Sequence, residues 1–462
     1  MFEWLLPVSA AELSRMIDAM VKTPIYQASD LIFNNILIFA TVFSALFYIL
    51  AVNGIFSRQK EHEQKSKIPN QNLPFVTVQI PTYNEPVAIR CAEKCLEFDY
   101  PADKFEVMIG DDSKDESISR MLDDFAGRHK DKIKLIRRPD NVGFKAGNLN
   151  NMLKHSKGEI IVIFDSDFTP PNDFLKRVVE PFVNDKKVAG VQSRWEFINA
   201  NQNLISRLSS SILIVYHHLT LPLINRFGVS FICGSAEAVR KDVLVKLGGW
   251  QNGSLTEDTE FSLRIMEMGY KNVYLPDLVT PGESPFTFKG FRRQQMRWAY
   301  GTMRAFMDHK KHIFFNKNFN VKQRLMLFFV LLGYLTAPLL ALLFVSGIMA
   351  FITNAPGPID WMEFSRSLGR NLALTSGFMA ASLVALRKNK RLSMFPKLLA
   401  SSFTIGILIS FSVSVAIFKS LLRRPMEWYM IQKNGNQVYA LFSGSAAPSL
   451  PSAGSDTYSH EL

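Results

Sequence analysis

Two aspartates stand directly after an apolar run in this sequence and could bind a cation. Asp165 and Asp167 follow residues 160–164, which are expected to form a buried strand. Residues two apart in extended backbone point to the same side, so the two carboxylates can be presented as a pair. A divalent cation would relieve their mutual repulsion, and Mg2+ or Mn2+ fits because no Cys or His is nearby in the sequence. The alternative is a plain turn or cap, which a lone DxD pattern more often forms.

Other polar residues also follow expected strands. They are Thr82, Asn84 and Glu85 after residues 75–80, and Asp111 and Asp112 after residues 105–109. Carboxylates beyond a strand end can accept hydrogen bonds from a base or a ribose, although Asp111 and Asp112 can equally form a turn with Ser113. Lys145 precedes an expected helix start, where a cation and free backbone N–H groups can hold a phosphate, unless it is an ordinary solvated lysine.

Two expected helices carry further polar groups. Glu257 and Asp258 open the helical run 259–268, so the simplest interpretation is an N-cap at Thr256 followed by acidic first-turn residues. Residues 291–298 combine guanidinium groups, amides and an indole. Beside a membrane, a helix of this kind can simply contact lipid headgroups.

Some chemically capable residues have structural interpretations. His217 and His218 lie in an apolar helical stretch, 204–221, which we expect to pack along the membrane interface. With no partner ligands in the sequence, we interpret these histidines as structural rather than metal-binding. The three cysteines are too few for a disulfide framework and indicate a reducing compartment. We expect Cys91 and Cys95 to be core residues.

The elements that must position the polar residues indicate an α/β domain. Five β-rich runs alternate with helical stretches in a polar block that spans about residues 65–322: 75–80, 105–109, 133–136, 160–164 and 188–192. This alternation predicts a mainly parallel sheet with helices on both faces. In such sheets ligands bind beyond the carboxyl ends of the strands, so we expect the functional residues to meet at that edge.

The composition indicates a membrane protein. The 462 residues are 47% hydrophobic and 20% charged, with a net charge of +12, which excludes a disordered or collagen-like chain. Four segments have no acidic or basic residue: 31–57, 325–359, 371–386 and 398–418. A helix needs about 20 apolar residues to cross a bilayer, so the first, second and fourth are long enough and the third is marginal.

The distribution of basic residues predicts the orientation but leaves the C-terminal topology open. Arg58, Lys60, Lys65 and Lys67 follow the first segment, which predicts a retained anchor, a cytoplasmic polar block and an external N-terminus. Basic residues at 387–391 and at 423–433 also indicate cytoplasmic positions. One crossing cannot connect two cytoplasmic ends. Either residues 398–418 re-enter or lie at the interface, or residues 371–386 do not cross.

Several motifs together resemble one enzyme family. In order along the chain they are the Asp112 region, Asp165-x-Asp167, Thr256-Glu-Asp258 and Gln294-Gln-x-Arg297-Trp298. This set resembles the processive membrane glycosyltransferases of family 2, the cellulose, chitin and hyaluronan synthase group. The strongest likeness is to plant cellulose-synthase-like A mannan synthases, through residues 78–81, 144–147, 191–197, 248–250 and 294–298. It covers about residues 70–310.

The resemblance implies a GT-A fold and a reaction. A hexosyl unit would pass, with inversion, from a nucleotide diphosphate donor of the UDP-glucose or GDP-mannose type to a growing β-glycan, processively and with export through the membrane helices. Asp258 would be the catalytic base, and Asp165 and Asp167 would hold Mg2+ or Mn2+. The donor side would comprise Thr82, Asn84, Glu85, Asp111, Asp112, Lys145, Asp165, Gln294, Arg297 and Lys433. The acceptor side would comprise Trp298, Glu257, Cys233 and Gly234.

The resemblance also implies a loop that closes over the nucleotide, written FxVTxK in the family. Residues 428–433 correspond to it, with Met430 and Ile431 in place of Val and Thr. If Lys433 reaches the diphosphate, an even number of crossings follows the catalytic domain. The alternative function is non-processive transfer that makes a glycolipid or a lipid-linked sugar. Nucleic acid is not an expected partner, and an accessory protein is left open.

These inferences divide the chain into six expected regions. They are an interfacial amphipathic segment (1–30), a transmembrane helix (31–57), a cytoplasmic GT-A domain (65–322), C-terminal membrane helices (323–422), the closing loop (423–442) and a disordered tail (443–462). The expected protein is therefore a multi-pass integral membrane enzyme with a cytoplasmic catalytic domain.

Overall fold

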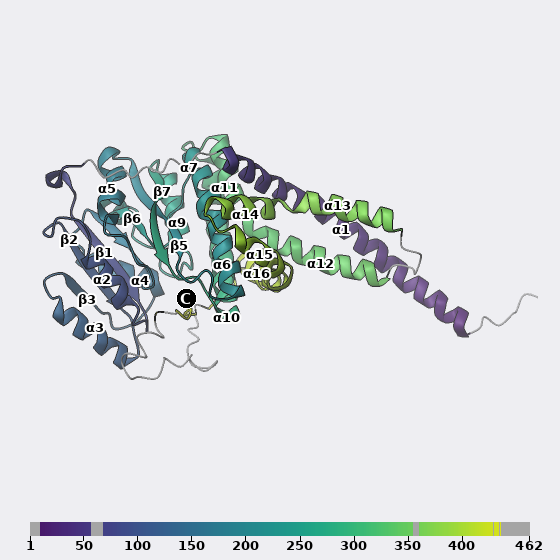
Figure 1. Cartoon of the computed structure of the whole chain (residues 1–462), viewed down its shortest axis with the longest axis horizontal. Helices are drawn as coiled ribbons and strands as arrows, with labels where there is room; N and C mark the ends of the chain where they lie inside the picture. Colours follow the sequence, from purple (N-terminus) through teal and green to yellow (C-terminus); the bar gives the residue numbers. More distant parts are fainter. Residues whose placement is uncertain (1–9, 57–67, 354–359, 428, 434, 436–462) are drawn as a thin grey trace, which may run out of the picture.

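The computed structural model describes residues 10–56, 68–353, 360–427, 429–433 and 435. A sheet domain covered by helices lies at one end of the long axis, and long helices extend away from it (Figure 1). The basic residues expected to follow the first membrane segment, 58–67, lie outside the described residues, as do Trp428 and the tail 443–462.

The sheet has seven strands in the order β3-β2-β1-β4-β6-β5-β7. They are β1 (Val76–Thr82), β2 (Phe105–Asp111), β3 (Ile133–Ile136), β4 (Ile160–Ile163), β5 (Val188–Phe197), β6 (Glu237–Arg240) and β7 (Lys271–Gly282). Only β6 is antiparallel to its neighbours, β4 and β5. The five expected strands are present, and the expected mainly parallel sheet is confirmed.

Two strands, β6 and β7, were not predicted. β6 has only four residues, and β7 contains Pro276 and Pro281, which weaken any strand pattern. Proline is tolerated in β7 because this strand lies at the edge of the sheet, where one side of the backbone needs no partner.

Helices cover both faces of the sheet, as expected. One face packs against α2 (Ala88–Leu96), α3 (Glu116–Arg128) and α5 (Phe174–Asn184), and the other against α4 (Phe144–His155), α8 (Lys241–Lys246) and α9 (Glu257–Glu267). In β4, Ile160 and Val162 face one apolar layer and Ile161 and Ile163 the other, since successive residues of a strand point to opposite faces. Cys91 and Cys95 are buried in the first layer, which confirms them as core residues.

The expected interfacial segment and the expected membrane segment lie in one continuous helix, α1 (Ala10–Phe56). By length and composition alone, Asp18–Phe56 could cross a membrane, and the division at residue 30 stays a prediction. Pro24 removes one backbone hydrogen bond inside this helix but does not end it.

The C-terminal region forms a helical hairpin beside α1. Its helices are α11 (Val321–Leu331), α12 (Thr336–Thr353), α13 (Trp361–Thr375) and α14 (Gly377–Lys388). The marginal segment 371–386 is divided between α13 and α14 at Ser376. The Gly377 N–H donates to Ser44 Oγ of α1 at 2.8 Å, and a side chain at Gly377 would collide with the Ser44 carbonyl. Both arms of the hairpin therefore pack on α1.

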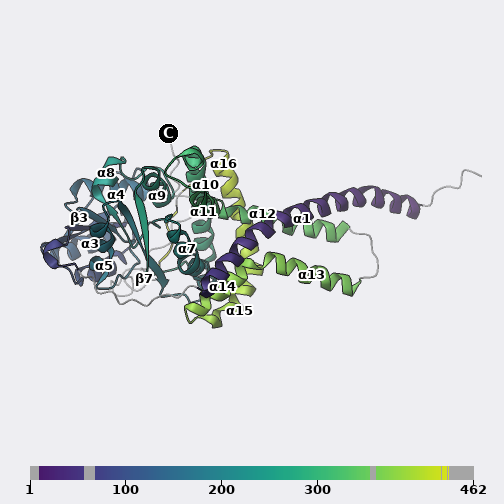
Figure 2. The same cartoon turned by 90° about the horizontal axis from the view of Figure 1, so that it is seen from above.

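The last helices take a different direction. α15 (Phe395–Ser401) and α16 (Ile407–Leu421) follow α14, and α16 packs along α10 (Phe288–Phe315). Both views place α16 across α1 and α12 rather than alongside them (Figures 1 and 2). By length and composition alone, Asp18–Phe56, Gly333–Thr353 and Leu392–Leu421 are the described helices that could cross a membrane.

Candidate active site

A pocket lies at the carboxyl ends of β1 and β4 and is closed on its other sides by α4, α9, α10 and a C-terminal loop. The predicted site residues that line it are Thr82, Glu85, Asp112, Lys145, Asp165, Asp167, Cys233, Gly234, Glu257, Asp258, Gln294, Arg297, Trp298 and Lys433. Parallel strands place their ends at one edge, and Thr82 lies opposite Asp111 in the β1–β2 register. Residues separated by more than 300 positions thus meet in one place.

Two predicted donor-side residues, Asn84 and Asp111, do not line the pocket. Asn84 Oδ1 accepts hydrogen bonds from the backbone N–H groups of Lys114 and Asp115, at 2.9 and 3.0 Å. Asp111 is buried, and its oxygens accept from Arg137 Nε at 2.8 Å and from the Ser113 N–H at 2.9 Å. Both side chains therefore hold the turns after β1 and β2, which is the alternative that the sequence left open for Asp111.

Asp112, the next residue, faces the pocket. Its carboxylate makes a two-point contact with Arg138, through Nε at 2.8 Å and Nη2 at 2.6 Å. Burial nevertheless raises the pKa of Asp112, against the lowering effect of this guanidinium. Arg138 also donates to the Phe144 carbonyl at the start of α4, so it fixes Asp112 relative to that helix.

Asp165 and Asp167 each pair with a different lysine. Asp165 lies 2.7 Å from Lys145 Nζ, and Asp167 lies 2.6 Å from Lys433 Nζ. Asp167 is almost fully buried and also accepts from the Glu283 N–H at 3.1 Å. Each carboxylate of the loop after β4 therefore has a lysine ammonium group against it.

Glu85 adds a third carboxylate to this side of the pocket. Ser166 Oγ donates to Glu85 Oε2. Burial raises the pKa of Glu85 to about 7; Lys433 opposes that shift, and the charges of Asp167 and Asp165 add to it. Because Glu85, Asp165 and Asp167 are so close together, binding of a proton or a cation would relieve the repulsion between them.

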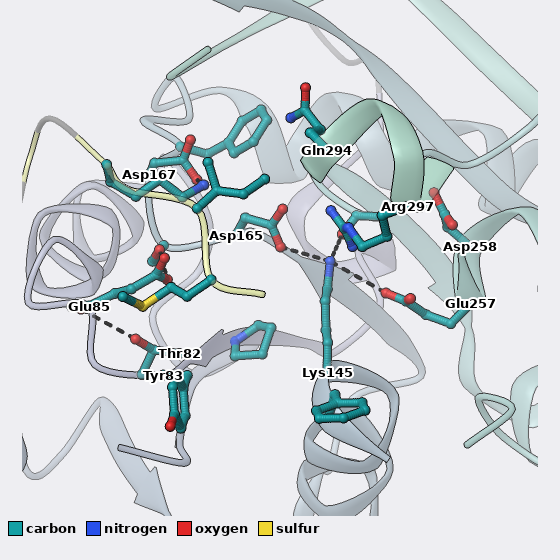
Figure 3. Close-up of a pocket in the computed structure, with 18 of the residues that line it drawn as sticks. Thr82, Tyr83, Glu85, Lys145, Asp165, Asp167, Glu257, Asp258, Gln294 and Arg297 are labelled. Carbon is teal, nitrogen blue, oxygen red and sulfur yellow. Dashed lines mark hydrogen bonds and ion pairs between the residues drawn. The ribbon is translucent and has the colours of Figure 1, made fainter. Parts of the chain in front are cut away.

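Lys145 lies between the two halves of the pocket. Its Nζ is 2.7 Å from Asp165 and 3.5 Å from Glu257, and it donates to the carbonyl of Gly234 (Figure 3). Burial alone would lower the pKa of Lys145, but the Asp165 and Glu257 carboxylates outweigh it and raise that pKa. The ammonium is therefore charged, and it connects the predicted donor side to the predicted acceptor side.

Asp258 occupies the first turn of α9, opposite Asp165. Burial, followed by the Glu257 charge, raises the pKa of Asp258 to about 7. The sequence interpretation of Thr256 as a side-chain cap is not supported, since its Oγ1 has no hydrogen-bond partner in the described part of the chain. A carboxylate with this pKa, on a pocket wall, is suited to accept a proton near neutral pH.

Helix α10 supplies Gln294, Arg297 and Trp298 to the pocket. These residues are three and four positions apart and so share one helix face. The charge of Arg297 lowers the pKa values of both Asp165 and Asp258, so this guanidinium is electrostatically close to both halves of the site. Arg293, one turn earlier, lies 3.8 Å from the ring centre of Tyr429. Arg293 therefore contacts the C-terminal loop, whereas the sequence alone suggested a contact with lipid headgroups.

Residues 429–433 form the remaining wall of the pocket, where a closing loop was predicted. Tyr429, Met430, Ile431 and Lys433 line it. Just beyond, the Gly435 N–H donates to Glu283 Oε1 at 3.1 Å, and Arg90 Nη2 lies 2.9 Å from the same oxygen. This segment is therefore anchored to the end of β7 as well as to Asp167.

Sequence reasoning missed several pocket residues. They include Tyr83, Asn141, Asn148, Phe168, Trp195, Phe197, Leu213, Leu255 and Glu283. Glu283 directly follows β7, so the rule that functional residues follow strands would have found it if the two prolines had not hidden that strand. Trp195 lies within residues 191–197, a motif shared with the plant mannan synthases, but the motif by itself does not indicate what Trp195 does.

Asp165 and Asp167 suit a cation that is shared with a ligand. Within the described ranges, no three His, Cys, Asp or Glu side chains are grouped so that they could hold a metal ion by themselves. Mg2+ is commonly bound through one or two carboxylates, with substrate phosphates and water completing its shell. The ammonium groups on Asp165 and Asp167 mark where positive charge is favourable, so the residues fit such an ion.

Comparisons with known proteins agree with this arrangement. The family described as Glycosyltransferase like family 2 matches residues 74–301. The chain is 33% identical over 276 residues to probable glucomannan 4-beta-mannosyltransferase 11 of Arabidopsis thaliana, covering 57% of this chain and 61% of that protein. It is 26% identical over 407 residues to probable glycosyltransferase YdaM of Bacillus subtilis, covering 84% of this chain and 94% of that protein.

A solved structure shares the fold. The mannosyltransferase PcManGT from Pyrobaculum calidifontis, in complex with GDP-Man and Mn2+, has a TM-score of 0.56 at 20% identity and covers 81% of this chain and 99% of its own. The expected GT-A fold is thus confirmed. The chain spans 61%, 50% and 49% of the lengths of three plant relatives that it matches.

Proposed function

Residues 74–301 form a glycosyltransferase domain of family 2, and on this basis we propose that the chain is an inverting hexosyltransferase. The donor is a nucleotide diphosphate sugar, GDP-mannose in the first instance and UDP-glucose as the alternative, and the acceptor is a hydroxyl of a β-glycan. The observation that carries the proposal is the pairing in one pocket of a carboxylate with a pKa of about 7, Asp258, with Lys145 and Arg297.

Single displacement assigns a role to each side of the pocket. Asp258 accepts the proton of the acceptor hydroxyl while that oxygen forms a bond to the sugar C1. The bond from C1 to the diphosphate oxygen breaks on the opposite face, and the nucleoside diphosphate leaves with the bonding electrons. Arg297, Lys145 and Lys433 carry the positive charge that stabilises the leaving diphosphate. Trp298 offers an aromatic face to the acceptor sugar.

A divalent cation belongs to this proposal. Asp165 and Asp167 would hold Mg2+ or Mn2+, which supplies charge neutralisation to the diphosphate when bound. Lys433 contacts Asp167, so we propose that this ammonium moves toward the diphosphate when the donor and the cation are present. PcManGT, which shares the fold, is in complex with Mn2+ as well as GDP-Man, and this supports the choice of ion.

The substitution Asp258→Asn tests the assignment of the base. With purified full-length protein, GDP-mannose, Mn2+ and a β-1,4-mannotriose acceptor, we expect transfer to fall by about 10²–10⁴-fold, because general base catalysis contributes that much. Binding of GDP, measured by calorimetry, should stay within about twofold, since the base acts on the acceptor. Asp124→Asn, on the exposed surface of α3, is the matched control. A parallel loss of GDP affinity would contradict the assigned role.

The same assay separates the two acceptor classes. A glycan product stays in the aqueous phase and grows in length if transfer is processive, whereas a lipid-linked sugar partitions into organic solvent. The apolar residues Phe197, Leu213 and Leu255 on the acceptor side favour lipid as the second candidate. Export of a glycan through the membrane helices is part of the leading proposal only if the product is polymeric.

We also propose that the membrane part has three crossings, with the catalytic domain in the cytoplasm. α1 and α12 would cross, and so would α13 and α14, which are each too short to cross alone but together form one arm of the hairpin. Leu392–Leu421 is apolar enough to cross by composition, but we place α15–α16 at the cytoplasmic interface because Lys433, beyond it, contacts Asp167. The packing of both hairpin arms on α1 supports this arrangement, as does the direction of α16 (Figure 2). α16 also exposes an apolar stripe on one side, at Leu408, Phe411, Val415 and Phe418, as an interfacial helix does.

A further inference from the structure

A buried polar cluster joins the sheet domain to the membrane hairpin. At its centre is Glu196, near the end of β5. His218 Nε2 lies 3.0 Å from Glu196 Oε1, and Asn389 Nδ2 lies 3.2 Å from both carboxylate oxygens. Arg391 Nη2 is 3.5 Å and Arg194 Nε 3.7 Å from the same carboxylate. Asn389 and Arg391 directly follow α14, so the second arm of the hairpin ends on this cluster.

Burying these charged and polar groups costs free energy of folding. Glu196 and His218 are 12% and 2% exposed in their side chains. Within the described part of the chain, Arg194 Nε, His218 Nδ1 and Arg391 Nη1 are buried without a hydrogen-bond partner. Apolar side chains of similar volume often stabilise a fold at least as well as a buried ionic group. Stability alone therefore does not account for the cluster.

The neighbouring residues connect the cluster to the pocket. His217 and His218 lie in a π-helical turn, Tyr216–Thr220, a local geometry that is frequent at functional sites. The ring of His217 stacks on Trp195, with 5.0 Å between ring centres, and its Nδ1 accepts from the Trp195 N–H at 3.4 Å. Two adjacent histidines thus hold two adjacent residues of β5: His217 holds Trp195, and His218 holds Glu196.

Trp195 is part of the wall of the pocket. Its indole Nε1 donates to the Ser235 carbonyl at 2.9 Å, and Ser235 Oγ accepts from the Asp165 N–H at 2.8 Å. Its ring also meets Phe168 edge to face, with 5.3 Å between centres. A shift of Trp195 would therefore move the 233–236 turn, which carries the acceptor-side residues Cys233 and Gly234.

We propose that Glu196, His218 and Asn389 are positioning residues that hold the Trp195 wall of the acceptor site in place from the membrane hairpin. In this arrangement, the packing of α14 on the cluster sets the shape of the acceptor pocket, while Asp112 on the donor side is held separately, by Arg138. The inference rests on the proposed function in one respect, namely that the acceptor binds on the Trp195 side.

The experiment uses full-length protein in lipid nanodiscs. Asn389→Ala removes two hydrogen bonds to Glu196 without leaving a buried charge unpaired. We expect it to raise the KM for β-1,4-mannotriose by about fivefold or more, since hydrogen bonds to charged groups are among the stronger ones. The kcat and the GDP affinity should stay within about twofold. Arg387→Ala is the matched control, because it removes a charge from the exposed end of α14 while Asn389 keeps its hydrogen bonds to Glu196.

A second pair of variants tests the histidine. His218→Leu should raise the acceptor KM as Asn389→Ala does, and His218→Gln should restore it, because the glutamine amide nitrogen can reach the position of Nε2. Equal effects of Leu and Gln would overturn the role of this hydrogen bond. An acceptor KM that is unchanged in Asn389→Ala, or raised as much in Arg387→Ala, would overturn the proposal as a whole.

Hydrogen exchange separates this proposal from the proposed function. In Asn389→Ala, the backbone amides of residues 193–197 should exchange at least about fivefold faster, whereas those of β2 should not change, because loss of a local contact raises local opening alone. This measurement needs no substrate. If the wild-type protein transfers no sugar but the exchange difference appears, the proposed function fails and the positioning role stands. Unchanged exchange at 193–197 overturns the positioning role, whatever the activity.

Discussion

At the residue scale, the environment of Asp258 predicts the pH dependence of the proposed sugar transfer. Burial and the charge of Glu257 raise the pKa of Asp258 to about 7. A base must be deprotonated to accept a proton, so we expect kcat/KM to rise with pH and to level off above about pH 7. The stability effect has the opposite sign. The folded protein binds this proton more tightly than the unfolded chain, so the free energy of unfolding falls as pH rises from about 4 to about 7.

A variant of Glu85 is the control for that pH profile, because burial raises the pKa of Glu85 to about 7 as well. In the variant Glu85→Gln, the inflection of kcat/KM near pH 7 should remain if Asp258 is the titrating base. An inflection that disappears in Glu85→Gln would assign the titration to Glu85 instead. The measurement is kcat/KM for GDP-mannose and mannotriose between about pH 5 and 9, at constant ionic strength.

At the element scale, the turn between residues 233 and 236 sets the surroundings of Asp258, the proposed base. Gly234 has a φ of +86°, a conformation that favours glycine. Its N–H donates to Glu237 Oε2 at 2.6 Å, and its carbonyl accepts from Lys145. A Cβ at this position would lie 3.3 Å from Asp258 Oδ2 and 3.4 Å from Lys145 Nζ. Glu237 and Lys145 therefore hold the turn from both sides, and its backbone lies next to Asp258.

The substitution Gly234→Ala tests this turn against a matched glycine. Gly248 has a similar φ of +89°, but a Cβ there would meet no atom within 4 Å. Both alanines should cost about 1–2 kcal/mol in the free energy of unfolding through backbone strain. We expect only Gly234→Ala to lower kcat, by about tenfold or more, because only its methyl group crowds Asp258. Equal losses of kcat in the two variants would attribute the effect to strain alone.

At the scale of the whole molecule, the proposed path of the C-terminal helices would account for the charge pattern. Basic residues at 387–391 and at 423–424 indicate two cytoplasmic ends, which a single crossing cannot connect. With α12 and α13–α14 as the crossings and α15–α16 at the interface, both basic groups lie on the side of the pocket. The loop 429–433 then reaches the pocket without a further crossing, in agreement with the contact between Lys433 and Asp167.

Cysteine labelling in sealed vesicles tests this topology. We expect Arg387→Cys and Arg424→Cys to react with a membrane-impermeant maleimide from the same side, and Asp360→Cys to react from the opposite side. These sides are expected because the polar residues that flank a crossing helix lie in the water on either side of the membrane. The unsubstituted protein gives the background, as Cys91 and Cys95 are buried and Cys233 is partly buried. Labelling of positions 387 and 424 from opposite sides would mean that α15–α16 crosses.

Much of the fold could be predicted from the sequence because it depends on local patterns, and so could the charged side chains of the candidate site that follow strands. Apolar runs predicted five strands, and the rule that ligands bind beyond strand ends selected Thr82, Asp112 and Asp165 without knowledge of any contact. The same local reasoning could not separate Asp111 from Asp112, since both follow the apolar run of β2. Only the packing of Arg137 and Arg138 decides which carboxylate faces the pocket.

By itself, the sequence predicted an α/β domain with carboxylates and cations at one sheet edge, a resemblance to family 2 glycosyltransferases, and helices apolar enough to cross a membrane. Residue types, their spacing and hydrophobic runs are sufficient for that conclusion. Only the tertiary structure decided that His217 and His218 support Trp195 and Glu196, that Lys145 lies between the two halves of the site, and how α16 runs. These are contacts between residues far apart in the chain, and no local periodicity specifies which distant partner a buried polar group will meet.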